Sequence, residues 1–470
     1  MIRDGNTLTA WDEWLQPPHE EGGLEDSQCQ ICFYCLGDTS EKSKPLKTME
    51  AVNKMTTSHA HGLDTCSKDP AGCMRAVVWN GKSVQLEHLS KPKVVEASDV
   101  VVKVTACSLS PDFAREVCGR YGAGLEKGQV LGSEAVGVVE CVGAAVNKVK
   151  IGDRVAVSFE LACGDCKHCR RHEFAACNCT NSSQEFKKMY GGWAPAAVLG
   201  STRMLGNVPG VQAEYVRVPF ADVNCFKLPS SVSDDKALLG VKTTVCALHA
   251  VDMAHVKEGD SVVIWGLGPI GLQAAHWCKL RGAKTVLGVE HSVDRIKFAH
   301  DHMNLEVVNR RDLSSAQIIA KLQQMLPPAG ADAVIDASGC STTGGWMTKL
   351  EKKMGMETKP ETTDMFKELL TIVRKCGHVA IVSDYMCSVE AFPIGHVAMK
   401  SLTVHAGRTP AQKYYPKVFD AIESGEIDPS VLISHRLALE EVPQAYSCIA
   451  KKDGDFLKAF VAPHEMRSKS

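Results

Sequence analysis

The sequence predicts a two-domain α/β protein, with a β-rich first domain and a doubly wound parallel sheet in the second. Short Val-rich segments broken by Gly, Pro and Asp fill residues 74–240, and such segments are typical of strands. From about residue 241, buried apolar strands alternate with helical segments, which indicates a parallel sheet. We therefore expect the second domain over residues 241–397 and expect residues 398–470 to complete the first domain.

The overall composition excludes several classes of protein. The chain has 470 residues, 44% of them hydrophobic and 23% charged, as in an ordinary globular protein. Its net charge of −2 suggests neither a nucleic-acid partner nor an anionic membrane surface. No apolar segment approaches the roughly 18–20 residues that a membrane span needs, and the N-terminus lacks the apolar core of a signal peptide. Twenty scattered cysteines fit a reducing compartment, so we expect a cytoplasmic protein.

The first 73 residues are predicted to form a disordered extension, because they show no sustained helical or strand period. Cys29, Cys32 and Cys35 within it have CxxC spacing, so a second zinc site there stays open as a hypothesis. The other interpretation is a start codon placed too far upstream, since Met74 begins the globular pattern. Residues 341–365 are rich in Gly and Lys without a strong period, and we expect a surface insertion there.

Four cysteines stand close together in the segment CGDCKHCRRHEFAAC, separated by two, two and seven residues. These are Cys163, Cys166, Cys169 and Cys177. Four thiolates at this spacing can close a tetrahedral shell around one Zn²⁺ and leave no position for water or substrate. The pattern therefore predicts a structural zinc site. The alternative of disulfides or free thiols is weaker, because dense disulfides are typical of small secreted domains.

A glycine motif, GLGPIG, lies between an apolar strand candidate and a helix candidate, which is the context of a dinucleotide site. Its residues are Gly266, Gly268, Pro269, Ile270 and Gly271. The glycines permit a tight turn, close approach of the pyrophosphate and close helix–strand packing. Glu290 ends the next strand candidate, 19 residues after the last glycine, where a carboxylate can bind both ribose hydroxyls. We predict NAD as the cofactor; the alternative is a Gly-rich turn beside a surface Glu.

With these motifs, the chain resembles the medium-chain, zinc-type alcohol dehydrogenase superfamily over residues 74 to about 463. Within it, the chain is most similar to the glutathione-independent formaldehyde dehydrogenase group. The segments that carry this likeness are YGGWAPAAVLG (190–200), QAEYVRVPFADV (212–223) and SGEIDPSVLISHRLALEEVPQAY (424–446). The resemblance implies a GroES-like catalytic domain around a Rossmann domain, a structural zinc lobe, nicotinamide in the cleft between the domains, and a homo-oligomer, either a dimer or a tetramer.

The catalytic zinc ligands that the resemblance implies do not match. Ser110 stands at the position of the first ligand, a Cys, and Arg115 at the His of the same motif. Ser133 replaces the His of the second motif, and Lys242 is the best match to the third ligand, a Cys or Asp. Hydroxyl groups are poor zinc ligands at neutral pH, and an ammonium group repels a cation. We therefore expect one structural zinc and no catalytic zinc.

The remaining polar residues near this predicted site suggest other roles. We predict that Lys242 stabilises a developing oxyanion, and that Ser110 and Ser133 donate hydrogen bonds or relay a proton. Asp112 is a candidate acid or base. Glu134 completes the candidate catalytic set, although pairing with a nearby basic residue is the more ordinary role for it. The alternatives are that the serines only fill space, that Lys242 faces solvent, and that the two carboxylates bind a metal loosely.

Three functions stay open from the sequence. The first is an NAD(H)-dependent oxidoreductase that transfers a hydride between nicotinamide and a small carbonyl, alcohol, quinone or enone, with zinc-free quinone reductases of the superfamily as the precedent. The alternative is a catalytically silent dinucleotide-binding protein with a sensing or structural role. A formaldehyde-type dehydrogenase with rearranged ligands is the third. The expected partners are a small-molecule substrate and further copies of the chain.

Overall fold

The computed structural model describes residues 72–110, 114, 117, 124–339, 362–385, 392–450 and 456–465. All the described residues belong to one compact unit. The predicted extension with its three cysteines, the candidate acid Asp112, Arg115 and most of the predicted insertion over 341–365 lie outside the described residues.

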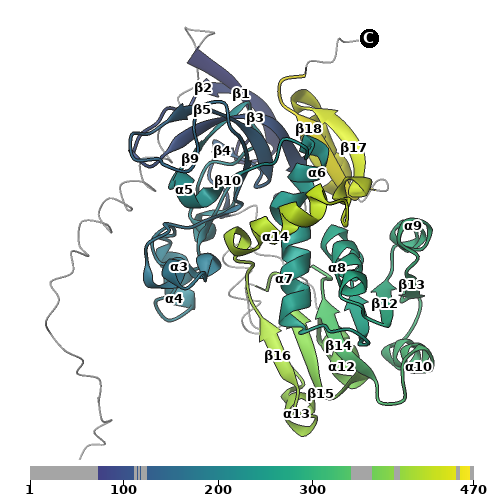
Figure 1. The fold of residues 1–470 in the computed structure, drawn as a ribbon. Helices are drawn as coiled ribbons and strands as arrows, with labels where there is room; N and C mark the ends of the chain where they lie inside the picture. The colour runs from purple at the N-terminus through teal and green to yellow at the C-terminus, as the bar shows by residue number, and fades with distance from the viewer. Residues whose placement is uncertain are drawn as a thin grey trace, which may run out of the picture. The chain divides into compact units, whose positions relative to one another are not determined.

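The first half of the chain folds into largely antiparallel sheets around a Val-rich core (Figure 1). In its described part, the larger sheet has the strand order β10-β6-β5-β3-β18-β17, with β9 also paired to β3. A smaller sheet has the order β2-β1-β4, and β7 pairs with β8. Val77 of the smaller sheet packs in the same core as Val102 and Val155 of the larger one. The strands are β1 (Cys73–Trp79), β2 (Val84–Ser90), β3 (Val100–Leu109), β4 (Gln129–Val130), β5 (Ala135–Val142), β6 (Arg154–Val157), β7 (Glu160–Leu161), β8 (Ala197–Val198), β9 (Tyr215–Val218), β10 (Cys225–Lys227), β17 (Ile433–Ala438) and β18 (Lys458–Ala462).

The second half forms a parallel sheet in the order β13-β12-β11-β14-β15-β16. All of β11 is buried: Val262 and Ile264 face one core, whereas Val263 and Trp265 face another. Burial on both faces explains why this strand is apolar without alternation. Because β11 lies between β12 and β14, the strand order reverses there, which is where doubly wound sheets bind dinucleotides. The strands are β11 (Ser261–Trp265), β12 (Thr285–Glu290), β13 (Glu306–Asn309), β14 (Ala331–Asp336), β15 (Val373–Ile381) and β16 (Thr403–Ala406).

Helices cover both faces of the parallel sheet. Helices α8 (Pro269–Leu280) and α9 (Val293–Met303) pack in one core, and α10 (Ser315–Met325) and α12 (Thr362–Ile372) pack in the other. The first two confirm the helices expected after the glycine motif and after the next strand. The other helical segments are α3 (Lys167–Arg170), η5 (Phe174–Ala176), α4 (Gln184–Met189), η6 (Arg203–Leu205), α5 (Ala221–Asn224), α13 (Ile394–Met399), η8 (Pro429–Leu432), η9 (Leu439–Glu441) and α15 (Val442–Ala450).

A continuous helical segment connects the two halves of the chain. It comprises α6 (Asp234–Leu239), the π-helical η7 (Gly240–Thr244) and α7 (Val245–Met253), and α14 (Ala411–Glu423) packs against it (Figure 1). Every residue of α7 except Asp252 is buried, so its sequence has no polar face and no helical period. For this reason a helix could not be predicted here from the sequence. The domain limits at residues 240 and 397 stay predictions.

The C-terminal strand β18 returns to the first half of the chain and pairs antiparallel with β3 (Figure 1). Its first residue, Lys458, is buried, and its Nζ lies 2.5 Å from Oε1 of the equally buried Glu134. Two charges taken out of water together are tolerated because the Lys458 ammonium group bonds the Glu134 carboxylate directly. This ion pair connects residues that are 324 positions apart in the sequence.

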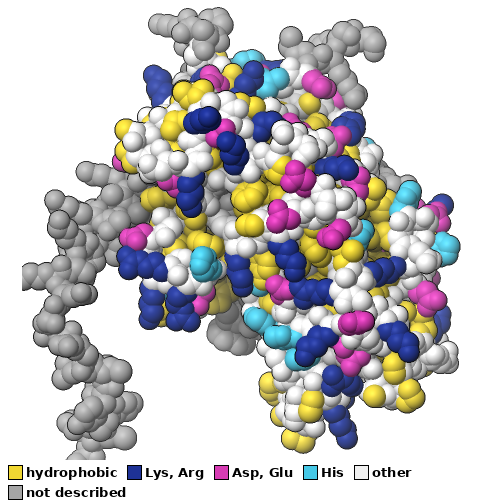
Figure 2. All heavy atoms as spheres, in the orientation of Figure 1, with side chains coloured by type: hydrophobic (Ala, Val, Ile, Leu, Met, Phe, Trp, Pro, Cys, Tyr) yellow, Lys and Arg dark blue, Asp and Glu magenta, His cyan; other side chains and the backbone are white. Residues whose placement is uncertain are grey.

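The described surface carries charges of both signs. Figure 2 shows basic and acidic side chains interspersed over the described part of one face. Among the described helices, none has both the length and the apolar character that crossing a membrane requires.

Removing one partner of the buried ion pair should destabilise the fold strongly. We expect Lys458→Met to lower the free energy of unfolding by about 3–5 kcal/mol, because the Glu134 carboxylate is left buried without its cation. Urea denaturation followed by fluorescence measures this. The double variant Lys458→Met/Glu134→Leu should recover most of the loss, and Lys284→Met, at an exposed site, should change stability little. A Lys458→Met protein as stable as wild type would contradict this account.

Candidate functional site

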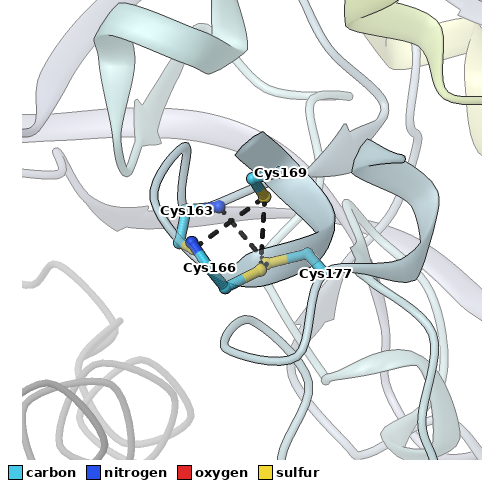
Figure 3. Close-up of side chains that lie close together, drawn as sticks. All are labelled: Cys163, Cys166, Cys169 and Cys177. Carbon is cyan, nitrogen blue, oxygen red and sulfur yellow. Dashed lines mark hydrogen bonds between the residues drawn. The ribbon is translucent and has the colours of Figure 1, made fainter. Parts of the chain in front are cut away.

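The four cysteines of the predicted zinc site lie together in the structure (Figure 3). Cys166 precedes α3, Cys169 lies within it, and Cys177 follows η5. The sulfur atom of Cys166 lies 3.6 Å from the sulfur of Cys169 and 3.9 Å from that of Cys177. The sulfur atoms of Cys163 and Cys169 are 3.9 Å apart. The backbone N–H of Cys163 donates to the sulfur of Cys177, and the backbone N–H of Cys166 donates to the sulfur of Cys163; both N···S distances are 3.3 Å. Such donors stabilise thiolates.

This donor set fits zinc. Four sulfurs at the usual Zn–S distance of about 2.3 Å stand about 3.8 Å apart in a tetrahedron, close to the separations observed. The apolar core of this lobe is small, since only Ala162, Phe174 and Ala196 join the buried cysteines Cys169 and Cys177 in it among the described residues. A bound zinc would therefore replace much of the missing core. All four positions would be filled by the protein, so the site is structural in kind.

The glycine motif has the geometry that a dinucleotide needs. Gly266 has φ 86°, and a Cβ there would lie 2.4 Å from Cα of Ser338, so only glycine fits the turn. A Cβ at Gly271 would lie 1.9 Å from the carbonyl oxygen of Gly266, so glycine also allows α8 to approach β11. Gly268 differs, because its Cβ position is open except for Nη1 of Arg295 at 3.8 Å. That open side is where a pyrophosphate can approach the backbone.

Two further predicted cofactor residues lie in the first turn of α8. Pro269 takes the first helical position, where a missing N–H costs nothing, and Ile270 lines the cavity described below. The motif thus presents the N-terminus of a helix, with its partial positive charge, to the open side of Gly268.

Glu290 ends β12 and is buried beside this loop. Its carboxylate accepts hydrogen bonds from the backbone N–H groups of Leu267, His291 and Ser292, at 2.7–3.0 Å. Burial by itself would raise the pKa of Glu290, but hydrogen bonds from His291 and Ser292 and the nearby Arg295 guanidinium lower it to about 2. The carboxylate is therefore ionised at any physiological pH and keeps acceptor capacity for ribose hydroxyls.

A small open cavity of about 70 Å³ adjoins the glycine motif. Ser133 of the first half, Lys242 of η7 and Ile270 of the motif all line it. The other lining residues are Phe159, Glu160, Val198, Ser201, Leu205, Cys246, Val382, Asp384, Gly407, Arg408 and Thr409. Lys242 is half-buried, and its Nζ lies 5.4 Å from the centroid of the Phe159 ring. Lys242 therefore contributes to the wall of the cavity.

Two other candidate catalytic residues, Ser110 and Glu134, are not among the residues that line this cavity. Ser110 is half-buried just after β3 and does not line the cavity. Glu134 is bonded to Lys458 and does not line it either, so its observed role is the structural one. Asp112 lies outside the described residues. Of the predicted set, Ser133 and Lys242 are the residues that the fold brings together.

Sequence reasoning missed an ion pair inside the cavity. Arg408 directs Nε and Nη2 to the same oxygen of Glu160, Oε1, at 2.7 Å each, and its Nη1 lies 3.6 Å from Asp384. Burial raises the pKa of Glu160 to about 7, and the Arg408 guanidinium limits this rise. One signal was available in the sequence, because Glu160 is the lone charged residue in the apolar segment 155–163.

The described cavity residues do not form a usual zinc shell. Within the part of the chain that the structure describes, the four-cysteine cluster is the sole group of three or more His, Cys, Asp and Glu side chains close enough to share an ion. The cavity offers three hydroxyl groups, an ammonium group, a thiol and two carboxyl groups, both of which are paired with Arg408; these belong to Ser133, Ser201, Thr409, Lys242, Cys246, Glu160 and Asp384. Burial also raises the pKa of the Cys246 thiol to about 12, which keeps it protonated.

Comparison with known proteins places this arrangement in a family. Residues 96–230 match the alcohol dehydrogenase GroES-like domain. A zinc-type alcohol dehydrogenase-like protein of Schizosaccharomyces pombe is 40% identical over 394 residues, which cover 83% of this chain and 92% of that protein. The chain belongs to the zinc-type medium-chain alcohol dehydrogenase family. It is therefore a medium-chain alcohol dehydrogenase-like oxidoreductase.

More distant family members agree with this assignment. A glutathione-independent formaldehyde dehydrogenase of Pseudomonas aeruginosa is 28% identical over 423 residues, covering 83% of this chain and 98% of that protein. The structure of alcohol dehydrogenase TADH from Thermus sp. ATN1 superposes with a TM-score of 0.68 at 27% identity, covering 83% and 99% of the two chains. Structures with the same fold at lower identity hold NADP in a Sinorhizobium meliloti protein and NADH in an E. coli protein. The predicted fold class and the resemblance to the zinc-type alcohol dehydrogenase family are thus confirmed, with formaldehyde dehydrogenases among the more distant relatives.

The zinc lobe can be tested by metal content. We expect wild-type protein purified without added metal to hold about one zinc per chain and Cys169→Ser to hold almost none, because three thiolates and a hydroxyl form a poor shell. Elemental analysis measures this. Limited proteolysis should then cut the variant within residues 163–177. Cys448→Ser, at an exposed cysteine, is the control and should keep its zinc; equal zinc in both variants would contradict the assignment.

Proposed function

We propose that this protein is an NAD(H)-dependent oxidoreductase that transfers a hydride between nicotinamide and a small carbonyl, alcohol, quinone or enone, without a catalytic zinc. One observation carries the proposal: Ile270 of the glycine motif lines the same cavity as Lys242 and Ser133. A cofactor held by the motif would reach a cavity that contains a cation and a hydroxyl. A substrate oxygen can be polarised there without a metal.

The residues that would hold the cofactor are those of the glycine motif and Glu290. The open side of Gly268 admits the pyrophosphate, and the N-terminus of α8 favours its charge. The ionised Glu290 carboxylate accepts the ribose hydroxyls and repels a 2′-phosphate, which favours NAD(H) over NADP(H). When bound, nicotinamide supplies or accepts the hydride.

Lys242 and Ser133 act on the substrate oxygen in this proposal. Positive charge fixed beside an oxygen that becomes negative lowers the barrier, because the cation interacts more strongly with the transition state than with the substrate. The same ammonium group opposes zinc at this position, and the Ser133 hydroxyl is a weak ligand for it. The Phe159 ring lies 5.4 Å from the ammonium group of Lys242, within the range of a cation–π contact that orients it.

Turnover with NADH tests the proposed reaction. We expect NADH oxidation with members of a panel of quinones, enones and aldehydes, and we expect Lys242→Met to lower kcat by about 100- to 1,000-fold with NADH binding unchanged. Stopped-flow absorbance and nucleotide fluorescence measure the two quantities. Lys284→Met, at an exposed lysine, is the control. NADH binding with no oxidation by any acceptor would contradict the proposal and would favour the silent dinucleotide-binding alternative.

Cofactor preference gives a separate test of Glu290. We expect wild type to bind NADH more tightly than NADPH and Glu290→Gln to narrow that preference by about tenfold or more, because the charge that repels the 2′-phosphate is gone. Fluorescence titration with both nucleotides measures it. Glu306→Gln, at an exposed position on the neighbouring β13, is the matched control. Equal affinities of the wild type for the two nucleotides would contradict the assignment of NAD.

A further inference from the structure

Glu160 is buried and pairs with the half-buried Arg408 through one carboxyl oxygen alone. Both N–H donors of Arg408 go to Oε1, so the guanidinium does not bind the carboxyl group in the usual two-oxygen fashion. The other oxygen, Oε2, is buried and has no hydrogen-bond partner among the described residues. Glu160 is 1% exposed and lines the cavity. A buried carboxyl oxygen without a partner is costly unless it carries a proton or meets a ligand.

The backbone at Glu160 is held firmly. Gln412 of α14 donates its Nε2 to the carbonyl oxygen of Glu160 at 2.7 Å, and to Oδ1 of Asn224 at 3.1 Å. The Asn224 side chain in turn bonds both the N–H and the carbonyl oxygen of Ala162, at 2.9 Å each. These bonds fix β7 against α14. The carboxyl group is therefore presented to the cavity by a rigid segment.

The charged and titratable groups around Glu160 allow it to exist in both protonation states. Arg408 also contacts Asp384, so the guanidinium keeps an anionic neighbour when Glu160 is neutral. Lys242, on η7, favours the ionised form of Glu160, whereas Asp384 disfavours it. The buried thiol of Cys246 on α7 stays neutral, because burial raises its pKa to about 12.

One more titratable group from α14 faces this carboxyl group. Burial raises the pKa of Tyr415, whose hydroxyl donates to the carbonyl oxygen of Val241 at 3.1 Å and therefore stays neutral. The pKa of about 7 for Glu160 is consistent with a proton that is easily given and taken near neutral pH.

We propose that Glu160 is the acid–base residue of this oxidoreductase, giving a proton to the substrate oxygen during reduction and taking it back during oxidation. The inference rests on the proposed function. In reduction the carbonyl carbon gains a hydride, with its electron pair, from the dihydronicotinamide, and the C=O double bond becomes a single bond. The carbonyl oxygen gains the proton from Oε2 as that O–H bond breaks, and Glu160 is left as a carboxylate. Oxidation is the reverse.

A purely structural ion pair would behave differently. A structural carboxylate would stay ionised over the neutral range, and its loss would lower stability without changing how the rate depends on pH. An acid–base residue must be protonated for reduction and ionised for oxidation. The reductive rate should therefore fall, and the oxidative rate should rise, as the pH increases through about 7.

The experiment combines a kinetic and a spectroscopic measurement on the full chain. We expect Glu160→Gln to lower the rate of NADH oxidation by about 100- to 10,000-fold and to abolish the pH dependence near 7, with NADH binding unchanged. Infrared difference spectra between pH 5 and 9 should show a carboxyl group that ionises near pH 7 in wild type and is missing in Glu160→Gln. Glu258→Gln, at an exposed glutamate, is the matched control for both measurements.

A second variant keeps the carboxyl group and changes its environment. Arg408→Met removes the cation that lowers the pKa of Glu160, so the infrared midpoint and the kinetic midpoint should both move to higher pH. A Glu160→Gln rate within threefold of wild type, or the absence of a Glu160-dependent infrared band, overturns the proposal while the oxidoreductase assignment stands. If none of the acceptors supports NADH oxidation by the wild type, both the proposed function and the role of Glu160 are contradicted.

Discussion

The ion pair between Arg408 and Glu160 is the constraint on which the candidate site depends. It joins β7 of the first half to the segment between β16 and α14, across 248 positions of sequence. Glu160 is buried and Arg408 is half-buried, so loss of the guanidinium would leave a carboxyl group in an apolar environment without its cation. The pair therefore connects the two halves of the chain at the cavity and limits the rise in the pKa of Glu160.

The zinc lobe and the cavity are close in sequence, and hydrogen bonds connect them in the structure. Cys163 begins the cysteine cluster three residues after Glu160. Asn224 bonds the backbone of Ala162 between them, and Gln412 bonds Asn224 and Glu160 together. A metal bound by the four sulfurs would therefore stiffen the segment that presents Glu160. A site that is structural in kind can still affect catalysis by fixing the position of a carboxyl group.

The reaction proposed here does not need a metal at the cavity. In that proposal the Lys242 ammonium group would supply the positive charge, and the Glu160 carboxyl group, with a pKa of about 7, would supply the proton, that a zinc ion with bound water can otherwise provide. The family relationship gives the framework, while these side chains distinguish the reaction proposed for this member. Activated carbonyls and quinones suit such a site, because they need less polarisation than a simple alcohol or aldehyde.

Local patterns in the sequence determined many of the strands of both halves, helices α8 and α9, the cysteine spacing of the zinc lobe and the glycine motif, because each depends on residues within one element or one turn. The sequence did not reveal α7, whose burial on nearly all sides removes the helical period. Only the tertiary structure decided that Glu134 pairs with Lys458, that Lys242 shares a cavity with Ser133, and that Glu160 meets Arg408. No local pattern relates residues so far apart in the chain. Their pairing follows from strand order and helix packing, and it fixes which polar groups are buried together.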